Sequence, residues 1–183
     1  MSTYTEESLC VFETCPLQYK FKYIDKLKFS IKSIEAFLDE VFLEVIYKIY
    51  NEAVTKNLAL VELMDFYLKT WSAKYNTLGI ITRPDRKPGL YLSIGRKAVE
   101  MYYEKNHPFN QKKIIGVNKK MLIDIDGAGK YIVEGYVPLV LETKEGILEI
   151  HDFKTQTVMP ARAEFDNDCH LSLYQMGIQQ MFP

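Results

Sequence analysis

The sequence has no excess of basic residues, no long apolar run and few cysteines, and each absence excludes a class of protein. Its 183 residues carry 23 Lys and Arg against 24 Asp and Glu, so binding of a polyanion would need a local basic patch. No apolar run approaches the roughly 18 residues of a membrane span. The first residues also lack the basic and apolar segments of a secretory signal. We therefore expect a cytoplasmic protein with no membrane partner.

The three cysteines, Cys10, Cys15 and Cys169, show neither a disulfide-like nor a zinc-like spacing. So few thiols are typical of a reducing compartment, and Cys10 and Cys169 are interpreted as small core residues. The composition is otherwise that of an ordinary globular chain, 48% hydrophobic and 26% charged. A chain of this length can bury one core, so we predict a single domain over residues 1–183.

The N-terminal half of the sequence predicts helices. Residues 33–56 place apolar side chains at the three-four spacing of one helix face, and a second apolar strip runs along the opposite side. A helix that is apolar on both sides is expected to pack between two layers. Further helices are predicted over residues 58–74 and 91–105, and residues 5–27 are predicted to form two short helices, the second opening at Pro16.

The C-terminal half predicts strands followed by a helix. Residues 113–125, 131–142 and 147–154 are strand-like and are separated by glycine-containing turns, which indicates an antiparallel three-stranded meander. A final helix is predicted over residues 166–181, with acidic and amide side chains available to cap its start. This order of elements usually needs more sheet to cover the last helix, which leaves truncation after Pro183 open.

The most informative segment is residues 135–155, two predicted strands of which the second ends in His-Asp-Phe-Lys. Side chains alternate across a strand, so Asp152 and Lys154 are expected on one face and His151, a packing residue in this interpretation, on the other. A carboxylate and an ammonium placed in this way can hold a divalent ion and an activated water together. This is the arrangement that hydrolysis of a phosphodiester requires.

Five segments in order resemble the RecB-type nuclease domain of the PD-(D/E)XK superfamily. They are SLCVFETCPLQYKFKYIDKL, SIEAFLDEVFLEVIYKIY, YYEKNHPF, the strand pair ending in EIHDFKT, and DNDCHLSLYQMGIQQMFP. The resemblance implies an α/β restriction-endonuclease-like core with a helical N-terminal half, an antiparallel strand meander and a C-terminal helix. It also implies a DNA nuclease of repair, recombination or defence that uses Mg²⁺ or Mn²⁺. DNA is then the expected partner, together with a helicase or another repair subunit.

The resemblance assigns roles to individual residues. Asp152 matches the metal-binding carboxylate of the D-x-K motif, and Lys154 matches the lysine that orients the attacking water. Tyr174 matches a tyrosine of the last helix that contacts DNA or supports the site. His170 lies four residues before that tyrosine, at a position where the family has Gln.

Other positions depart from the family pattern. Pro138 stands where a second metal-binding Asp belongs, and Asn118 replaces a Glu of the first strand. Leu43 stands near the place of an early-helix His, and Asp39 replaces the Gly that commonly precedes this His. Loss of one of two metal carboxylates should weaken binding of the ion. The alternative to an active nuclease is therefore a degenerate domain that keeps the fold and cleaves poorly or not at all.

Two further features of the N-terminal segment bear on ligands. Lysines alternate with aromatic residues over residues 17–32, and Lys20 and Lys22 among them suit a groove that follows a nucleic-acid strand. The solvated lysine face of an amphipathic helix explains the same pattern equally well. Cys15 precedes a proline as in iron–sulfur relatives, which use three later cysteines. No cysteine follows Cys169, so this chain holds no complete iron–sulfur ligand set.

Overall fold

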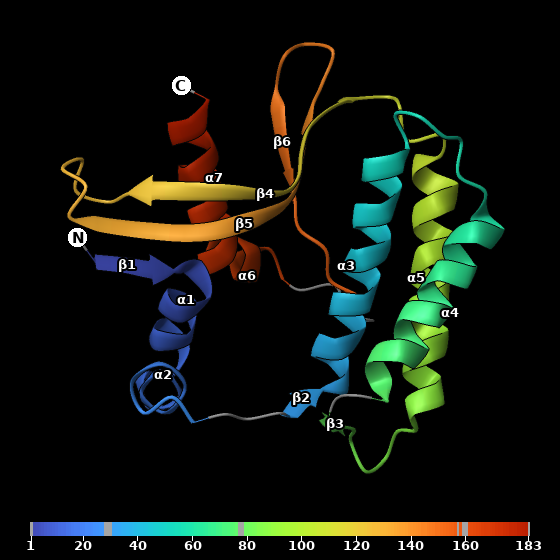
Figure 1. Cartoon of the computed structure of the whole chain (residues 1–183), viewed down its shortest axis with the longest axis horizontal. Helices are drawn as coiled ribbons and strands as arrows, with labels where there is room; N and C mark the ends of the chain where they lie inside the picture. The colour runs from blue at the N-terminus through green and yellow to red at the C-terminus, as the bar shows by residue number, and fades with distance from the viewer. Residues whose placement is uncertain (1, 28–30, 77–78, 157, 159–160, 183) are drawn as a thin grey trace.

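Three long helices occupy one end of the molecule, and a mixed sheet with the remaining helices occupies the other (Figure 1). The computed structural model describes residues 2–27, 31–76, 79–156, 158 and 161–182. The α/β architecture predicted from the sequence is confirmed. Within the described residues, no helix is long and apolar enough to cross a membrane.

Three long helices form the larger core, as their apolar periodicity predicts. They are α3 (Ile34–Glu52), α4 (Leu60–Tyr75) and α5 (Pro88–Asn106), and α3 packs against both of the others. Ser33 caps α3 by accepting a hydrogen bond from the amide of Ala36, and Phe37 of α3 is fully buried against Trp71 of α4. On the opposite strip of α3, Leu43 and Tyr47 line a pocket, and Tyr50 is buried in the same core.

The predicted meander is confirmed as β4 (Lys113–Asp124), β5 (Tyr131–Glu142) and β6 (Leu148–His151). The last strand ends at His151, three residues earlier than predicted, and begins one residue later. A further strand, β1 (Ser2–Thr5), pairs in parallel with β5 and was not predicted. Such a pairing joins segments far apart in sequence, so no local turn announces it.

One edge of β5 is shared by two different strands. Residues 131–134 pair with β1, and residues 139–142 pair with β6. No ladder partner is found for residues 135–138 on this edge within the described part of the chain. Proline cannot donate to a ladder, and the gap therefore accommodates Pro138 in the middle of a long strand. Across the other edge lies Asn118, whose backbone has a φ of 46°, a left-handed conformation that asparagine tolerates better than most residues.

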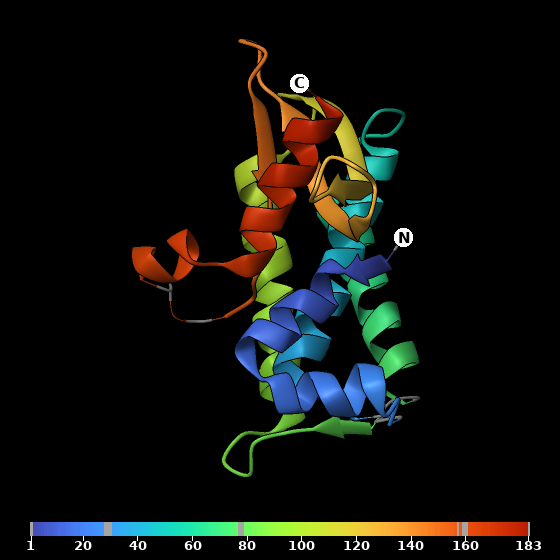
Figure 2. The same cartoon turned by 90° about the vertical axis from the view of Figure 1, so that its left-hand side faces the viewer.

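Both ends of the chain lie on the same side of the sheet (Figure 2). The N-terminal segment forms α1 (Glu6–Thr14), α2 (Pro16–Tyr19) and a π-helical turn (Lys20–Ile24), and the C-terminal segment forms α6 (Arg162–Asp166) and α7 (Cys169–Met181). A small parallel pair, β2 (Ile31–Ser33) and β3 (Gly79–Ile81), lies at the start of α3. Helix α7 packs on β4 and forms the smaller core with it.

A disulfide joins Cys10 of α1 to Cys169 at the start of α7, with 5.7 Å between the two Cα atoms. The interpretation of these residues as unpaired core cysteines is therefore wrong. They are 159 positions apart in sequence, and only the packing of α1 on α7 brings them together. Cys15 keeps a free thiol and is half-buried.

Candidate active site

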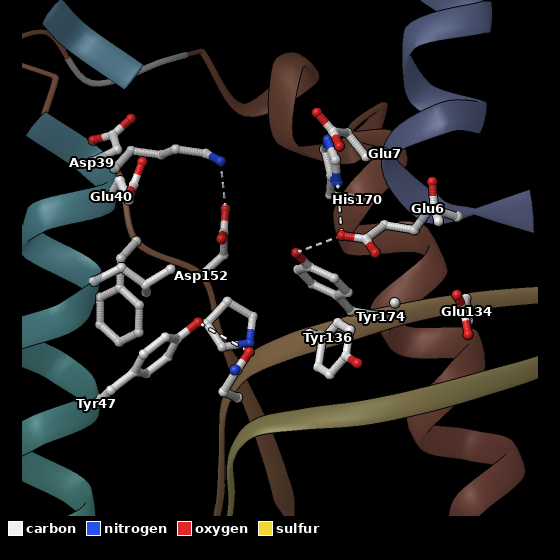
Figure 3. Close-up of a pocket in the computed structure, with 17 residues that line it drawn as sticks. Glu6, Glu7, Asp39, Glu40, Tyr47, Glu134, Tyr136, Asp152, His170 and Tyr174 are labelled. Atoms are coloured by element: carbon white, nitrogen blue, oxygen red, sulfur yellow. Dashed lines mark hydrogen bonds and ion pairs between the residues drawn. The ribbon is translucent and has the colours of Figure 1, made fainter. Parts of the chain in front are cut away.

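A pocket of about 480 Å³ opens at the gap in the β5 edge (Figure 3). Its walls come from α1, α3, the gap itself, the segment after β6, and α7. The structure brings together in this pocket most of the residues that the sequence singles out. They are Asp39, Leu43, Asn118, Pro138, Asp152, Lys154, His170 and Tyr174.

Asp152 and Lys154 lie just beyond the end of β6 and form an ion pair, with 3.0 Å between Asp152 Oδ2 and Lys154 Nζ. The Asp152 side chain is 16% exposed, and that of Lys154 is 45% exposed. Burial lowers the pKa of Lys154, but the negative charge of Asp152, helped by Asp168 and Asp39, outweighs burial and raises the pKa overall. Lys154 is therefore held as an ammonium beside the carboxylate.

The Asp-Phe-Lys segment is anchored on both sides. Asp39 of α3 accepts hydrogen bonds through Oδ1 from the Thr155 amide at 2.7 Å and from its hydroxyl at 2.6 Å. The ring of Phe153 packs edge-on against Phe42 and Tyr102 in the helical core. Asp39 thus has a structural use at a position where the family pattern has glycine, because its carboxylate fixes the segment that carries Asp152 and Lys154.

The strand register places Pro138 beside Asp152, since Leu139 pairs with His151. Pro138 and Leu43 offer no side-chain oxygen to an ion at this point. Tyr47 of α3 donates a hydrogen bond from its hydroxyl to Asn118 Oδ1 at 3.3 Å. Burial, reinforced by nearby carboxylates, raises the pKa of Tyr47 to about 12, so the phenol stays protonated.

The sequence did not single out Glu6, the first residue of α1, yet it occupies the opposite wall of the pocket. Its Oε1 accepts a hydrogen bond from the Tyr174 hydroxyl at 3.4 Å and lies 3.6 Å from His170 Nδ1. Its Oε2 lies over Gly135, where an added Cβ would be only 2.1 Å away. In the sequence, Glu6 looks like an ordinary acidic residue of a first helical turn. Only the packing of α1 on β5 reveals its position.

The Glu6 carboxylate controls the protonation of its neighbours. Its hydrogen bond raises the pKa of His170, against the opposing effects of burial and of Lys154. Burial raises the pKa of Tyr174, and the charges of Glu6 and Asp152 act in the same direction. Tyr174 is therefore a hydrogen-bond donor in this pocket and not a base.

The pocket is lined by more anionic than cationic groups. Its carboxylates are Glu6, Glu7, Asp39, Glu40, Glu134 and Asp152, and its cations are Lys154 and His170. Three of the carboxylates, Glu7, Glu40 and Glu134, pair with lysines outside the lining. The remaining three carboxylates, Glu6, Asp39 and Asp152, still outnumber the two cations, and this small excess of negative charge favours entry of a cation.

The donor set fits a hard divalent ion only in an open arrangement. The described residues contain no group of three or more His, Cys, Asp or Glu side chains that could enclose a metal ion. Figure 3 shows why: Asp152 faces Glu6 and His170 from the other side of the pocket. Mg²⁺ is commonly held by one or two carboxylates together with the phosphate of the substrate. Asp152 with a bound phosphate fits that description, and a closed protein cage does not.

The lysines Lys20 and Lys22 fall outside the described lining of this pocket. Lys20 pairs with Asp25 at 2.9 Å, and Lys22 pairs at 2.6 Å with Glu7 on the rim. Both lie on an irregular helical segment with a π-helical turn instead of the second regular helix that the sequence predicts. Their contact with DNA stays a prediction.

Comparison with known families agrees with the fold. A family model described as the PD-(D/E)XK nuclease superfamily matches residues 5–183. The chain therefore belongs to the PD-(D/E)XK nuclease superfamily, and its mixed α/β fold is consistent with that assignment. A comparison with curated proteins found no match.

Proposed function

We propose that the protein is a metal-dependent DNA nuclease domain of the RecB type that hydrolyses phosphodiester bonds. The supporting observation is the Asp152–Lys154 pair, anchored at the edge gap of β5 in a pocket with excess negative charge. The resemblance extends the proposal to repair, recombination or defence in the cytoplasm, with a helicase or another repair subunit as partner.

The chain's own residues divide the work in this proposal. Asp152 would hold Mg²⁺ or Mn²⁺ together with the substrate phosphate, and the ion would supply Lewis-acid stabilisation of the charge on that phosphate. Lys154 has a raised pKa, so it acts as a charged donor to the phosphate or the attacking water and not as a base. Tyr174 is a second protonated donor, held in place by Glu6.

A second candidate is a degenerate domain that binds DNA and cleaves it poorly or not at all. The observation that favours it is Pro138, which lies beside Asp152 where a second carboxylate would serve the ion. Leu43 reinforces it, because the same wall of the pocket offers an apolar side chain in place of a ligand.

Cleavage of single- and double-stranded DNA with Mg²⁺ and with Mn²⁺ separates the two candidates. Cleavage by the wild type that is lost in Lys154→Ala and Asp152→Asn supports the nuclease and overturns the hypothesis of a degenerate domain. No cleavage by the wild type, with activity gained in Pro138→Asp, supports the degenerate domain. Because a direct ligand should matter at least as much as an outer-shell partner, we expect Pro138→Asp to raise cleavage by about 10- to 100-fold.

A further inference from the structure

A second cavity, of about 600 Å³, opens on the other side of the Asp152–Lys154 segment, against α5. We call it the α5 groove and define it by Lys97, Met101, Tyr102 and Lys105 of α5 together with residues 152–156. Asp152, Phe153 and Lys154 line both this groove and the pocket described above. A molecule lying in the groove would therefore reach the candidate active site without leaving the surface.

The α5 groove is cationic where the pocket is anionic. Its lining has three ammonium groups, from Lys97, Lys105 and Lys154, and a single carboxylate, Asp152, which is already paired with Lys154. Lys105 makes no ion pair with any residue that the structure describes. Lys97 pairs with Glu100 at 3.1 Å, but the two side chains are 64% and 40% exposed, and such surface pairs are weak. Lys97 and Lys105 are therefore available to bind the phosphates of a polyanion.

The lysines are arranged on one face of α5. Lys97, Met101 and Lys105 follow one another at intervals of four residues, which places them along one side of the helix over about 12 Å. Met101 lies between the two lysines and is 57% exposed. The half-buried rings of Tyr102 and Phe153 form the floor beside this row.

Cations that flank an exposed apolar strip match one class of ligand well. A single nucleic-acid strand offers phosphates to the lysines and unpaired base faces to Met101 and the aromatic floor. A duplex offers the phosphates but stacks its base faces inside, so it leaves the apolar strip unused. We propose that the α5 groove binds a single-stranded segment of nucleic acid that continues from the phosphate at Asp152 and Lys154.

A neighbouring cavity extends the same path. It has a volume of about 360 Å³, shares Ile94, Thr155 and Gln156 with the α5 groove, and adds Arg83 and Arg86. Each arginine lies within 4.0 Å of a carboxylate, at 3.4 Å from Glu35 and 3.9 Å from Asp85, on exposed surface. The strand would thus run from the candidate active site along α5 toward its first turn. The direction of the strand rests on the proposed function, whereas binding in the groove does not.

Fluorescence anisotropy with a labelled oligo(dT) strand and a labelled hairpin duplex, in EDTA, tests the groove without requiring cleavage. Lys97→Ala combined with Lys105→Ala should weaken binding of the single strand about tenfold at low salt. The slope of log K against log salt should become shallower by about 1.4, because two phosphate contacts are removed. Lys69→Ala combined with Lys144→Ala removes two exposed lysines from outside the groove and is the matched control.

The groove is overturned if the two double variants weaken binding equally, if neither does, or if the wild type prefers the duplex or binds neither probe. Circular dichroism should show both variants folded, as expected for exposed side chains. An inactive wild type whose strand binding depends on Lys97 and Lys105 would overturn the proposed nuclease while supporting the groove. A wild type that cleaves DNA, but whose strand binding does not depend on Lys97 and Lys105, would support the proposed nuclease and overturn the groove.

Discussion

The two sides of the Asp152–Phe153–Lys154 segment differ in charge and in construction. The pocket side gathers carboxylates, whereas the α5 groove gathers lysines, although both are lined by the same three residues. If the proposed function holds, the two environments would serve two opposite charges. One attracts the cation that neutralises a phosphate, and the other attracts the polyanion that brings the phosphate in.

The two sides also depend on different parts of the chain. The groove side is built on α5, a single long helix packed in the large core. The pocket side requires the two ends of the chain, because Glu6 comes from α1 and His170 and Tyr174 come from α7. The disulfide between Cys10 and Cys169 links these two helices. Because the pocket depends on contacts between these two distant helices, we expect loss of the disulfide to disrupt the pocket more than the groove.

The largest expected effect separates chemistry from binding. Lys154→Ala should lower the cleavage rate by about 10²–10³, as loss of a charged donor to a transition state does. It should weaken strand binding in EDTA by no more than about threefold, because Lys97 and Lys105 remain. Lys97→Ala should show the opposite pattern, raising KM and leaving kcat nearly unchanged. If the wild type is inactive, Lys154→Ala and Lys97→Ala are measured in the Pro138→Asp background. Equal effects of the two substitutions on kcat would contradict the assignment of chemistry to the pocket and of binding to the groove.

Loss of the disulfide should destabilise the pocket side. Cys10→Ser combined with Cys169→Ser should lower the free energy of unfolding by about 2–5 kcal/mol, because the bond closes a long loop in the unfolded chain. Urea denaturation measures this, and dithiothreitol applied to the wild type should reproduce it. Cys15→Ser is the control, since this thiol is free. A wild type equally stable with and without reductant would contradict the prediction.

Gly135→Ala tests how closely Glu6 lies on β5. The added Cβ would meet Glu6 Oε2 at 2.1 Å and Met121 Cε at 2.7 Å. Both are ends of flexible side chains, so we expect a cost of about 1–2 kcal/mol and displacement of the Glu6 carboxylate. The pKa of His170, followed by NMR, should then fall toward its ordinary value. Gly89→Ala is the control, because its Cβ would meet nothing within 4 Å, and unchanged His170 titration in Gly135→Ala would refute the contact.

The smallest effect concerns pH. The pKa of His170 is raised in the folded protein, chiefly by Glu6, with Asp168 acting in the same direction and with burial and Lys154 acting against it. Protonated His170 therefore stabilises the fold below its unfolded pKa of about 6.5, and this contribution disappears as pH rises through the folded value. The stability difference between the wild type and His170→Gln should be larger near pH 5 than near pH 8. His107→Gln, on the helical side of the molecule, is the control, and a difference that does not change with pH would exclude the effect.

Local patterns predicted a large part of the fold. The three long helices and the meander follow from apolar periodicity and glycine turns, which act over a few residues. Strand register places Pro138 beside Asp152, which follows directly after the last residue of β6, and Lys154 lies two residues further along the chain. Their chemical roles stay predictions.

The missed features that build the pocket are long-range. Strand β1, the Glu6 contacts and the Cys10–Cys169 bond each join the N-terminal segment to residues more than 100 positions away. No spacing in the sequence encodes such a pair. The early end of β6 at His151 was also not predicted. Four residues later, the Thr155 amide donates a hydrogen bond to Asp39 of α3 and not to a neighbouring strand.

The sequence by itself determined the helices, the meander and the Asp-x-Lys motif, because each depends on side chains within a turn or two of one another. Only the tertiary structure decided that Glu6 completes the pocket, that a disulfide joins the two ends of the chain, and that one short segment separates an anionic pocket from a cationic groove. Electrostatic environment depends on which groups are brought within a few ångströms in space. Folding sets those distances across the whole chain.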